Sequence, residues 1–180
     1  DIRFAGADTL ATSYTLACAI KKLGVFDLVI CGEKTIDGDT AQVGPEVAEF
    51  LGIPHVAYVE EIRKIDRDGI VVKSKMGKNY YLIELSFPGL ITVTKDVNNP
   101  RLPTFRDKLR SRKTEITIWN AESLSEIAEI NRFGISGSPT SVVKVYAPHS
   151  ESRRGLIFHG DAEEAAERIV KILKELNVLR

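Results

Sequence analysis

The stretch FDLVICGEKTIDGDTAQVGPEVAEFLGIPHVAYVEEI, residues 26–62, decides the fold class. It places a short apolar run at 26–32 before a helix-like run at 45–53 and a second apolar run at 55–62. Short continuous apolar runs are typical of strands that are covered on both faces. A helix between two such strands makes a βαβ unit, whose strands run parallel. The stretch therefore predicts an α/β protein with a parallel core sheet.

The segments that follow this unit extend the sheet. Residues 62–85 alternate apolar and polar side chains, with turn signals at Asp68–Gly69 and Gly77, and this pattern predicts an antiparallel hairpin insertion. The apolar run at 89–96 predicts a further buried strand, and residues 115–120 are expected to close the sheet region.

Helix signals occur on either side of the sheet segments. Asp8 or Thr9 can cap a helix that Gly24 ends, and the end of the segment 97–113 has a helical pattern. The last segment, 161–179, predicts an amphipathic helix with one apolar face, made by Ala166, Ile169, Val170 and Leu173.

Residues 121–155, between the sheet region and the last helix, have a weaker pattern of apolar and polar side chains. Residues 132–141 predict a loop, 142–148 a strand and 149–155 a polar linker. We therefore expect an α/β domain at 1–120 and a C-terminal arm and helix at 121–180.

Composition narrows the class of protein. Lys plus Arg and Asp plus Glu both number 25, so the charge balance does not favour nucleic acid as a partner. Cys18 and Cys31 lie in apolar runs, which favours buried thiols of a cytoplasmic protein, and no Cys–His cluster predicts a metal. No apolar run approaches the length that spans a membrane.

The loop after the first strand has the features of an anion site. The strand ends at Gly32, so the loop is expected at the carboxyl edge of the parallel strands, where α/β proteins bind ligands. The N–H groups of residues 40–43 would lie at a helix N-terminus, and Gly38 and Gly44 permit close backbone approach.

An ordinary loop remains the alternative, with Asp39 or Thr40 as the helix cap. If the phosphate hypothesis is correct, a Gly44→Val exchange is expected to remove the nucleotide and leave the fold intact.

A second group of small and polar residues, 4–14, precedes the first helix. Thr9 and Thr12 would lie on one face of its first turn, where their hydroxyls could bind a sugar or a flavin ring edge. Simple capping is the alternative. Two helix N-termini beside one crevice would suit a nucleotide.

Catalytic side chains are not indicated. The three histidines have no neighbouring nucleophile context and no carboxylate pair stands out, which disfavours a hydrolase; they are His55, His149 and His159. The segment 99–113 combines basic residues with Phe105 and Leu109. It could anchor a partner protein, or it could be a solvated helix that turns these two side chains into the core.

Two long motifs in this order resemble the β subunit of electron transfer flavoproteins, the FixA-like family. They are DLVICGEKTIDGDTAQVGPEVAEFLGIP at 27–54 and ITVTKDVNNPRLPTFRDKLRSRKTEITIW at 91–119. The likeness continues more loosely through 136–148 and the last helix. The family's N-terminal segment, with a V-K-x-V-P-D-type start, is missing, so the chain resembles a fragment.

The resemblance implies a fold of the adenine-nucleotide α-hydrolase-like, Rossmann-like type. It implies a heterodimer with an α subunit that carries an FAD and on which the C-terminal arm and helix pack. In ordinary members the loop matching Asp39–Gly44 holds a structural AMP. In the electron-bifurcating branch the β subunit instead holds a second FAD that accepts a hydride from NADH. That branch passes electrons on to the α-subunit FAD and to a ferredoxin or flavodoxin.

The sequences FAGADTLATSY at 4–14 and DGDTAQVGP at 37–45 resemble the bifurcating branch, since ordinary members have a DDDCNQTG-like second loop. Thr9 and Thr12 would then contact the flavin or its ribityl chain, and the second loop would line the ADP part. The expected cofactor-binding residues are Ala5, Gly6, Ala7, Asp8, Thr9, Thr12, Gly32, Asp39, Thr40, Ala41, Gln42, Val43 and Gly44.

The segment Pro100–Arg110 resembles the family's recognition loop, which docks on an acyl-CoA dehydrogenase. The expected partner-binding residues are Arg101, Leu102, Phe105 and Leu109. A non-redox module that binds an adenine nucleotide is the alternative from a different class.

Overall fold

The computed structural model describes residues 1–146, 155, 157 and 160–178. The chain divides into two compact units, Asp1–Val142 and Val143–Arg180, which are described separately. The division lies later in the chain than the boundary expected after residue 120.

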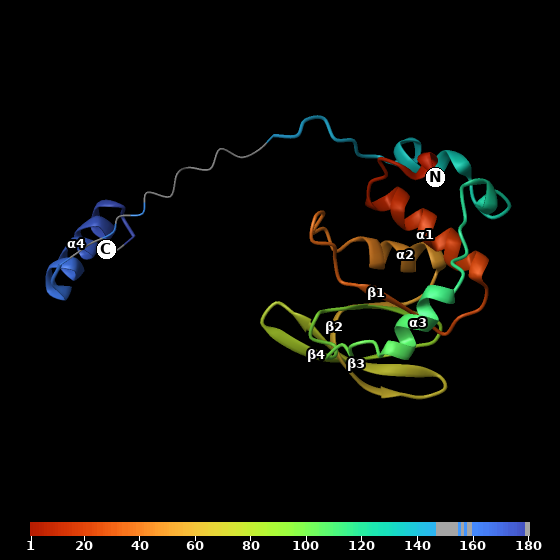
Figure 1. Ribbon diagram of the computed structural model, residues 1–180, viewed down its shortest axis with the longest axis horizontal. Helices are drawn as coiled ribbons and strands as arrows, with labels where there is room; N and C mark the ends of the chain where they lie inside the picture. The colour runs from red at the N-terminus through yellow and green to blue at the C-terminus, as the bar shows by residue number, and fades with distance from the viewer. Residues whose placement is uncertain (147–154, 156, 158–159, 179–180) are drawn as a thin grey trace. The chain divides into compact units, whose positions relative to one another are not determined.

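The first unit is built on a five-stranded open sheet (Figure 1). β1 and β2 both pair parallel with β5, while β2, β3 and β4 form antiparallel pairs. The expected parallel core and antiparallel hairpin insertion are therefore confirmed. The strands, in the order β1-β5-β2-β3-β4, are β1 (Leu28–Gly32), β2 (His55–Ile65), β3 (Gly69–Met76), β4 (Asn79–Ser86) and β5 (Gly89–Val93).

The helices in the described residues follow the expected order. The α-helices are α1 (Thr9–Leu23), α2 (Val43–Leu51), α3 (Phe105–Lys113) and α4 (Ala162–Glu175). Short 3-10 helices occupy Ile2–Phe4, Glu122–Leu124, Ile130–Arg132 and Gly134–Gly137.

The two helices nearest the sheet begin differently. The carboxylate of Asp8 accepts a hydrogen bond from the Ala11 N–H and caps α1, which ends at Gly24 as predicted. α2 begins after Gln42, whose side chain makes no capping hydrogen bond. The alternative that Asp39 or Thr40 caps this helix is therefore wrong.

The core of the first unit lies on both sides of the sheet. α1 and α2 cover one face, where Ala17, Val47 and Ala48 pack against Leu90 of β5. On the opposite face, strands β2 to β5 bury their own cluster of Val56, Val59, Ile70, Val72, Leu85 and Ile91.

The prediction that β1 is covered on both faces is wrong. Its Ile30 side chain is 58% exposed. Among the residues that the structure describes, β1 is an edge strand that pairs only with β5, and the two packed helices cover one of its faces.

Two expected extended segments form no strand in the part of the chain that the structure describes. Residues 115–120 alternate polar and apolar side chains as a strand does. Ile116 and Ile118 are nevertheless 83% and 86% exposed, because no neighbouring strand pairs with this segment. Residues 142–146 are likewise extended and unpaired. The remainder of that expected strand, His149 and His159 lie outside the described residues.

The part of the first unit that follows residue 120 packs against the start of the chain and against α1. Ala121, Leu124 and Phe133 are buried in one cluster, and Phe4 and Tyr14 pack against it. The rings of Phe4 and Phe133 meet edge to face, with centroids 5.2 Å apart. This cluster joins the start of the chain and the start of α1 to residues that follow the sheet.

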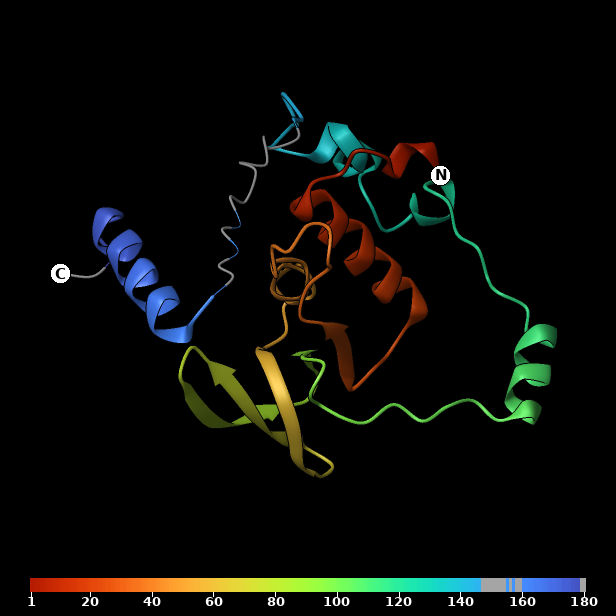
Figure 2. The same cartoon turned by 60° about the vertical axis from the view of Figure 1, so that its left-hand side comes forward.

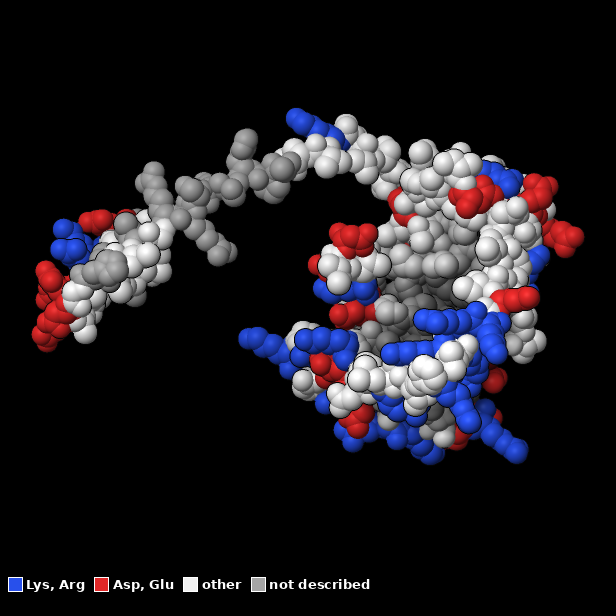
Figure 3. All heavy atoms as spheres, viewed as in Figure 1, with Lys and Arg blue, Asp and Glu red and all other residues white. Residues whose placement is uncertain are grey.

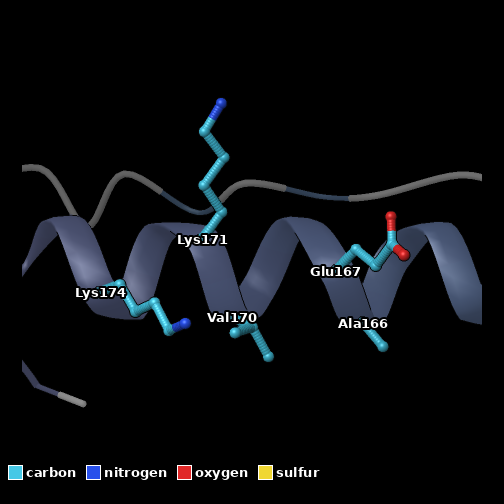
Figure 4. Close-up of a pocket in the computed structure, with 5 residues that line it drawn as sticks. All are labelled: Ala166, Glu167, Val170, Lys171 and Lys174. Atoms are coloured by element: carbon cyan, nitrogen blue, oxygen red, sulfur yellow. The ribbon is translucent and has the colours of Figure 1, made fainter. Parts of the chain in front are cut away.

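The second unit contains α4, which is amphipathic as predicted. Figure 4 shows Ala166 and Val170 on one side of the helix and Lys171 on the other. Val170 and Ile169 are 43% and 46% exposed, so their apolar face is uncovered by the residues that the structure describes. Neither α4 nor any other helix in the described ranges is long and apolar enough to cross a membrane.

Candidate nucleotide-binding site

An open hollow of about 320 Å³ lies where β1 ends and α2 begins. This is the carboxyl edge of the parallel strands, the position at which α/β sheets bind ligands. One side of α1 also reaches it. The residues that line the hollow are Thr12, Leu16, Cys31, Gly32, Glu33, Lys34, Thr35, Thr40, Ala41, Gln42, Val43 and Gly44.

Five consecutive residues, 40–44, line one side of the hollow. Within the described part of the chain, the N–H groups of residues 40–44 have no protein acceptor. Pro45 follows them and has no N–H to offer. The N-terminus of a helix carries a partial positive charge, so these free donors suit an anionic group such as phosphate.

The backbone that presents these groups is strained. Asp39 and Ala41 have φ angles of 50° and 56°, in the left-handed region that non-glycine residues seldom occupy. Strain of this kind concentrates at binding sites, where the surrounding structure holds it in place. The carboxylate of Asp39 forms an ion pair of 2.5 Å with Lys34, and the hydrogen bond between them raises the pKa of Lys34.

Gly44 has a packing role that the sequence did not indicate. It is buried, and a Cβ added to it would overlap the Cγ2 methyl of Thr92 in β5. The absent side chain therefore lets the first turn of α2 rest directly on the sheet. A valine side chain at this position would overlap Thr92, so we expect Gly44→Val to destabilise the fold as well as to weaken nucleotide binding.

The two threonines at the start of α1, Thr9 and Thr12, have different neighbours. Thr12 lines the hollow, as expected for a ligand contact. Thr9 does not line it, and its hydroxyl lies 3.3 Å from Glu46 Oε1 and 3.4 Å from Gln42 Oε1 of α2. Thr9 thus holds the two helices together at the edge of the site.

The small residues before α1 lie away from the hollow. Ala5 lines a different depression of about 540 Å³, together with Phe133 and Ile135. Gly6 has φ 69° and leaves no room for a Cβ beside Ile135. None of the residues 5–8 lines the first hollow.

Asp8 is occupied by structural hydrogen bonds. Besides Ala11, its carboxylate accepts from the N–H and the hydroxyl of Thr140, at 3.1 and 2.9 Å. Burial of the carboxyl group raises its pKa, but these hydrogen bonds outweigh that effect and hold the pKa of Asp8 below its ordinary value of 3.8. Asp8 therefore joins the start of α1 to the segment that follows Phe133.

Five lining residues were missed by the sequence reasoning: Leu16, Cys31, Glu33, Lys34 and Thr35. Three of them follow the end of β1 directly, so the predicted strand end could have revealed them. Burial raises the pKa of the Cys31 thiol, which keeps it protonated at neutral pH. The described residues contain no group of His, Cys, Asp and Glu arranged to hold a metal ion.

The expected partner segment is exposed. Phe105 and Leu102 are 77% and 91% exposed, and Leu109 is 44% exposed, so the alternative that Phe105 and Leu109 turn into the core is wrong. α3 stands at the end of an extended segment, away from the sheet (Figure 2). Basic side chains gather over it (Figure 3), and they include Arg106, Lys108, Arg110, Arg112 and Lys113.

The fold is of the Rossmann-like α/β class, with an open hollow at the carboxyl edge of the parallel strands. Comparison with known proteins agrees with this class. The family model for the electron transfer flavoprotein domain matches residues 1–124. The chain therefore belongs to the electron transfer flavoprotein family.

Curated relatives cover nearly the whole chain. It is 39% identical to the electron transfer flavoprotein subunit beta of Megasphaera elsdenii, over 98% of this chain and 66% of the relative. It is 41% identical to the subunit of the same name from Thermoanaerobacterium thermosaccharolyticum, over 99% and 67%. The caffeyl-CoA reductase-Etf complex subunit CarD of Acetobacterium woodii is 39% identical, over 99% and 67%. The chain thus spans about two thirds of the length of these relatives.

Proposed function

We propose that this chain is the nucleotide-binding part of an electron transfer flavoprotein β subunit that holds FAD. The observation that carries the proposal is the row of free backbone N–H groups at residues 40–44, which line the hollow at the start of α2. Fixed donors at a helix N-terminus fit a diphosphate, because they need no counter-charge from a side chain. Lys34 lies in the same hollow but is already paired with Asp39.

Different residues of the site would contact different parts of the FAD. Gly32 and residues 40–44 would line the ADP part, and Thr12 would contact the ribityl chain or the flavin. Asp39 does not line the hollow and would hold Lys34 beside it. Residues 5–8 and Thr9 would support α1 and form the margin of the site, in keeping with the hydrogen bonds of Asp8 and Thr9. A hollow of about 320 Å³ is near the lower limit of ligand pockets, about 300–1,000 Å³, so it suits one part of a dinucleotide.

The bound flavin would supply the redox chemistry, accepting a hydride from NADH and releasing electrons to the α-subunit FAD and to a ferredoxin or flavodoxin. The chain's own part would be to bind the cofactor and fix its orientation. Backbone donors and hydroxyls serve that purpose, and no general base is required. The names of the relatives, two electron transfer flavoprotein subunits and one Etf complex subunit, support a role in electron transfer, which we propose to take place in the cytoplasm.

Two exposed surfaces would serve partner proteins. The apolar face of α4 and the arm before it would pack on the α subunit. Arg101, Leu102, Phe105 and Leu109 would dock on a dehydrogenase of the acyl-CoA type, since exposed apolar and Arg side chains are typical of interfaces.

The nucleotide content of the full-length heterodimer tests the proposal. We expect two FAD per heterodimer and bleaching of the flavin absorbance by NADH under anaerobic conditions. One FAD and one AMP per heterodimer, with no bleaching by NADH, would contradict the bifurcating role.

That second result would instead support an ordinary β subunit with structural AMP, a candidate that the small volume of the hollow favours. A complex with AMP or ATP and no flavin at all would support a nucleotide-binding module without a redox role.

A further inference from the structure

Thr92, at the carboxyl end of β5, lies beneath the first turn of α2. Its side chain is 1% exposed. A Cβ built on Gly44 would overlap the Thr92 Cγ2 methyl and would lie 3.7 Å from Thr92 Cβ and 3.8 Å from Cys31 Cβ. The Thr92 methyl therefore sets how closely the backbone of α2 approaches the sheet at the residue that ends the row of free N–H groups.

The hydroxyl of Thr92 has a separate partner. Thr92 Oγ1 accepts a hydrogen bond of 3.1 Å from the N–H of Tyr58 in β2. Tyr58 has φ 57°, which is a true outlier for a bulky side chain. It lies where the register of β2 against β5 shifts, between Val56 and Val59, so the Thr92 hydroxyl holds an irregularity of the neighbouring strand.

We infer that Thr92 is a positioning residue for the nucleotide site, an inference that rests on the proposed function. Its methyl group sets the distance between the sheet and the N–H groups at the start of α2. Its hydroxyl holds the irregular backbone at Tyr58. The two groups branch from the same carbon atom and contact different elements. Substitutions can therefore remove one contact and keep the other.

The two contacts predict opposite patterns of affinity and stability. Thr92→Ser removes the methyl and leaves a gap under Gly44, so the free N–H groups are held less firmly and nucleotide binding weakens. Thr92→Val keeps the methyl but leaves the Tyr58 N–H without its acceptor. It is therefore expected to lose stability while it keeps its affinity for nucleotide.

The experiment uses the full-length heterodimer, stripped of nucleotide and titrated separately with AMP and with FAD. We expect Thr92→Ser to raise the dissociation constant of the nucleotide that the parent binds by about five- to tenfold. Thr92→Val should change it by less than about twofold, although its urea midpoint of unfolding is lower than that of the parent.

Ile91→Val is the matched control, because it also removes a methyl group from β5 but on the opposite face, where Ile91 is fully buried. We expect it to lower the midpoint of unfolding without weakening binding. Affinity that follows stability across all three variants would overturn the inference, as would equal affinity of Thr92→Ser and the parent. A parent heterodimer that binds neither AMP nor FAD would contradict the proposed function as well.

Discussion

Ser13 of α1 and Glu46 of α2 join the two helices beside the hollow, with Ser13 Oγ 2.9 Å from Glu46 Oε2. Ser13 is completely buried, and the other carboxylate oxygen of Glu46 is within reach of the Thr9 hydroxyl. The two oxygens of one carboxylate thus lie within hydrogen-bond distance of two hydroxyls of α1, although the single proton of the Ser13 hydroxyl is shared with the Thr9 carbonyl oxygen at 2.7 Å. The carboxylate lies in the first turn of α2, where the helix dipole favours negative charge.

Glu46→Ala is expected to lower the free energy of unfolding by about 1 kcal/mol, because the two hydroxyls lose a charged acceptor. Urea denaturation measures the change. Glu49→Ala is the control, since Glu49 is exposed on the same helix. An equal loss in both variants would show that the contact with α1 adds nothing.

Asp8→Ala should lower the free energy of unfolding at pH 7 by about 1–2 kcal/mol through loss of the helix cap. The pKa of Asp8 is lowered in the folded protein, so its stabilising effect is present above the ordinary value of 3.8 and is lost as the pH falls through the folded value. The difference between parent and variant should therefore shrink in acid. A difference between Asp8→Ala and the parent that stays constant with pH would contradict the assignment.

Gly44→Ala should cost about 1–3 kcal/mol of stability, since the new methyl overlaps Thr92. Gly32→Ala is the control, because a Cβ on Gly32 meets nothing within 4 Å. Thermal unfolding of the two variants compares them directly. If Gly44→Ala is as stable as Gly32→Ala, α2 does not rest on the sheet as described.

The rate at which the Cys31 thiol is chemically modified can show whether a ligand fills the hollow. Its thiol lines the site and its pKa is raised by burial, so iodoacetamide should modify it slowly at neutral pH and faster as the pH rises. In a Cys18→Ser background, saturating AMP or FAD should slow the modification at least severalfold. Labelling at the same rate with and without nucleotide would mean that neither ligand covers Cys31.

Phe105→Ala is expected to leave the free energy of unfolding within about 0.5 kcal/mol of the parent value, since the ring is 77% exposed. If α3 docks on a dehydrogenase as proposed, the variant should slow electron transfer to that protein while the flavin content stays constant. Ile116→Ala provides an equally exposed apolar control outside the segment. Unchanged transfer rates in Phe105→Ala would remove α3 from the docking surface.

Elements with local signals were predictable from the sequence. Asp8 and Gly24 mark both ends of α1 because caps act within one or two turns. The turn at Asp68–Gly69 likewise fixes the hairpin of β2 and β3. The hollow at the end of β1 followed from the order of strand, loop and helix.

Features that depend on distant partners were not predictable. Residues 115–120 have the alternation of a strand but no neighbour to pair with. The loop before α1 has ligand-like residues, yet its Asp8 is engaged by Thr140, which is far away in the sequence. The contact between Gly44 and Thr92 also joins two elements whose packing no local pattern encodes.

The free donors at residues 40–44 belong to the main chain, and this affects how the site can change. Every residue except proline carries the same N–H group, so only replacement by proline, which also fixes φ, could delete one of these donors. An alanine scan would therefore understate their contribution. Replacing single amides of this row by esters, through chemical synthesis of the segment, would remove one donor and leave the side chains untouched. The side chains at residues 40–43 are therefore free to vary as long as the backbone path is kept, whereas Gly44 is constrained by its contact with Thr92.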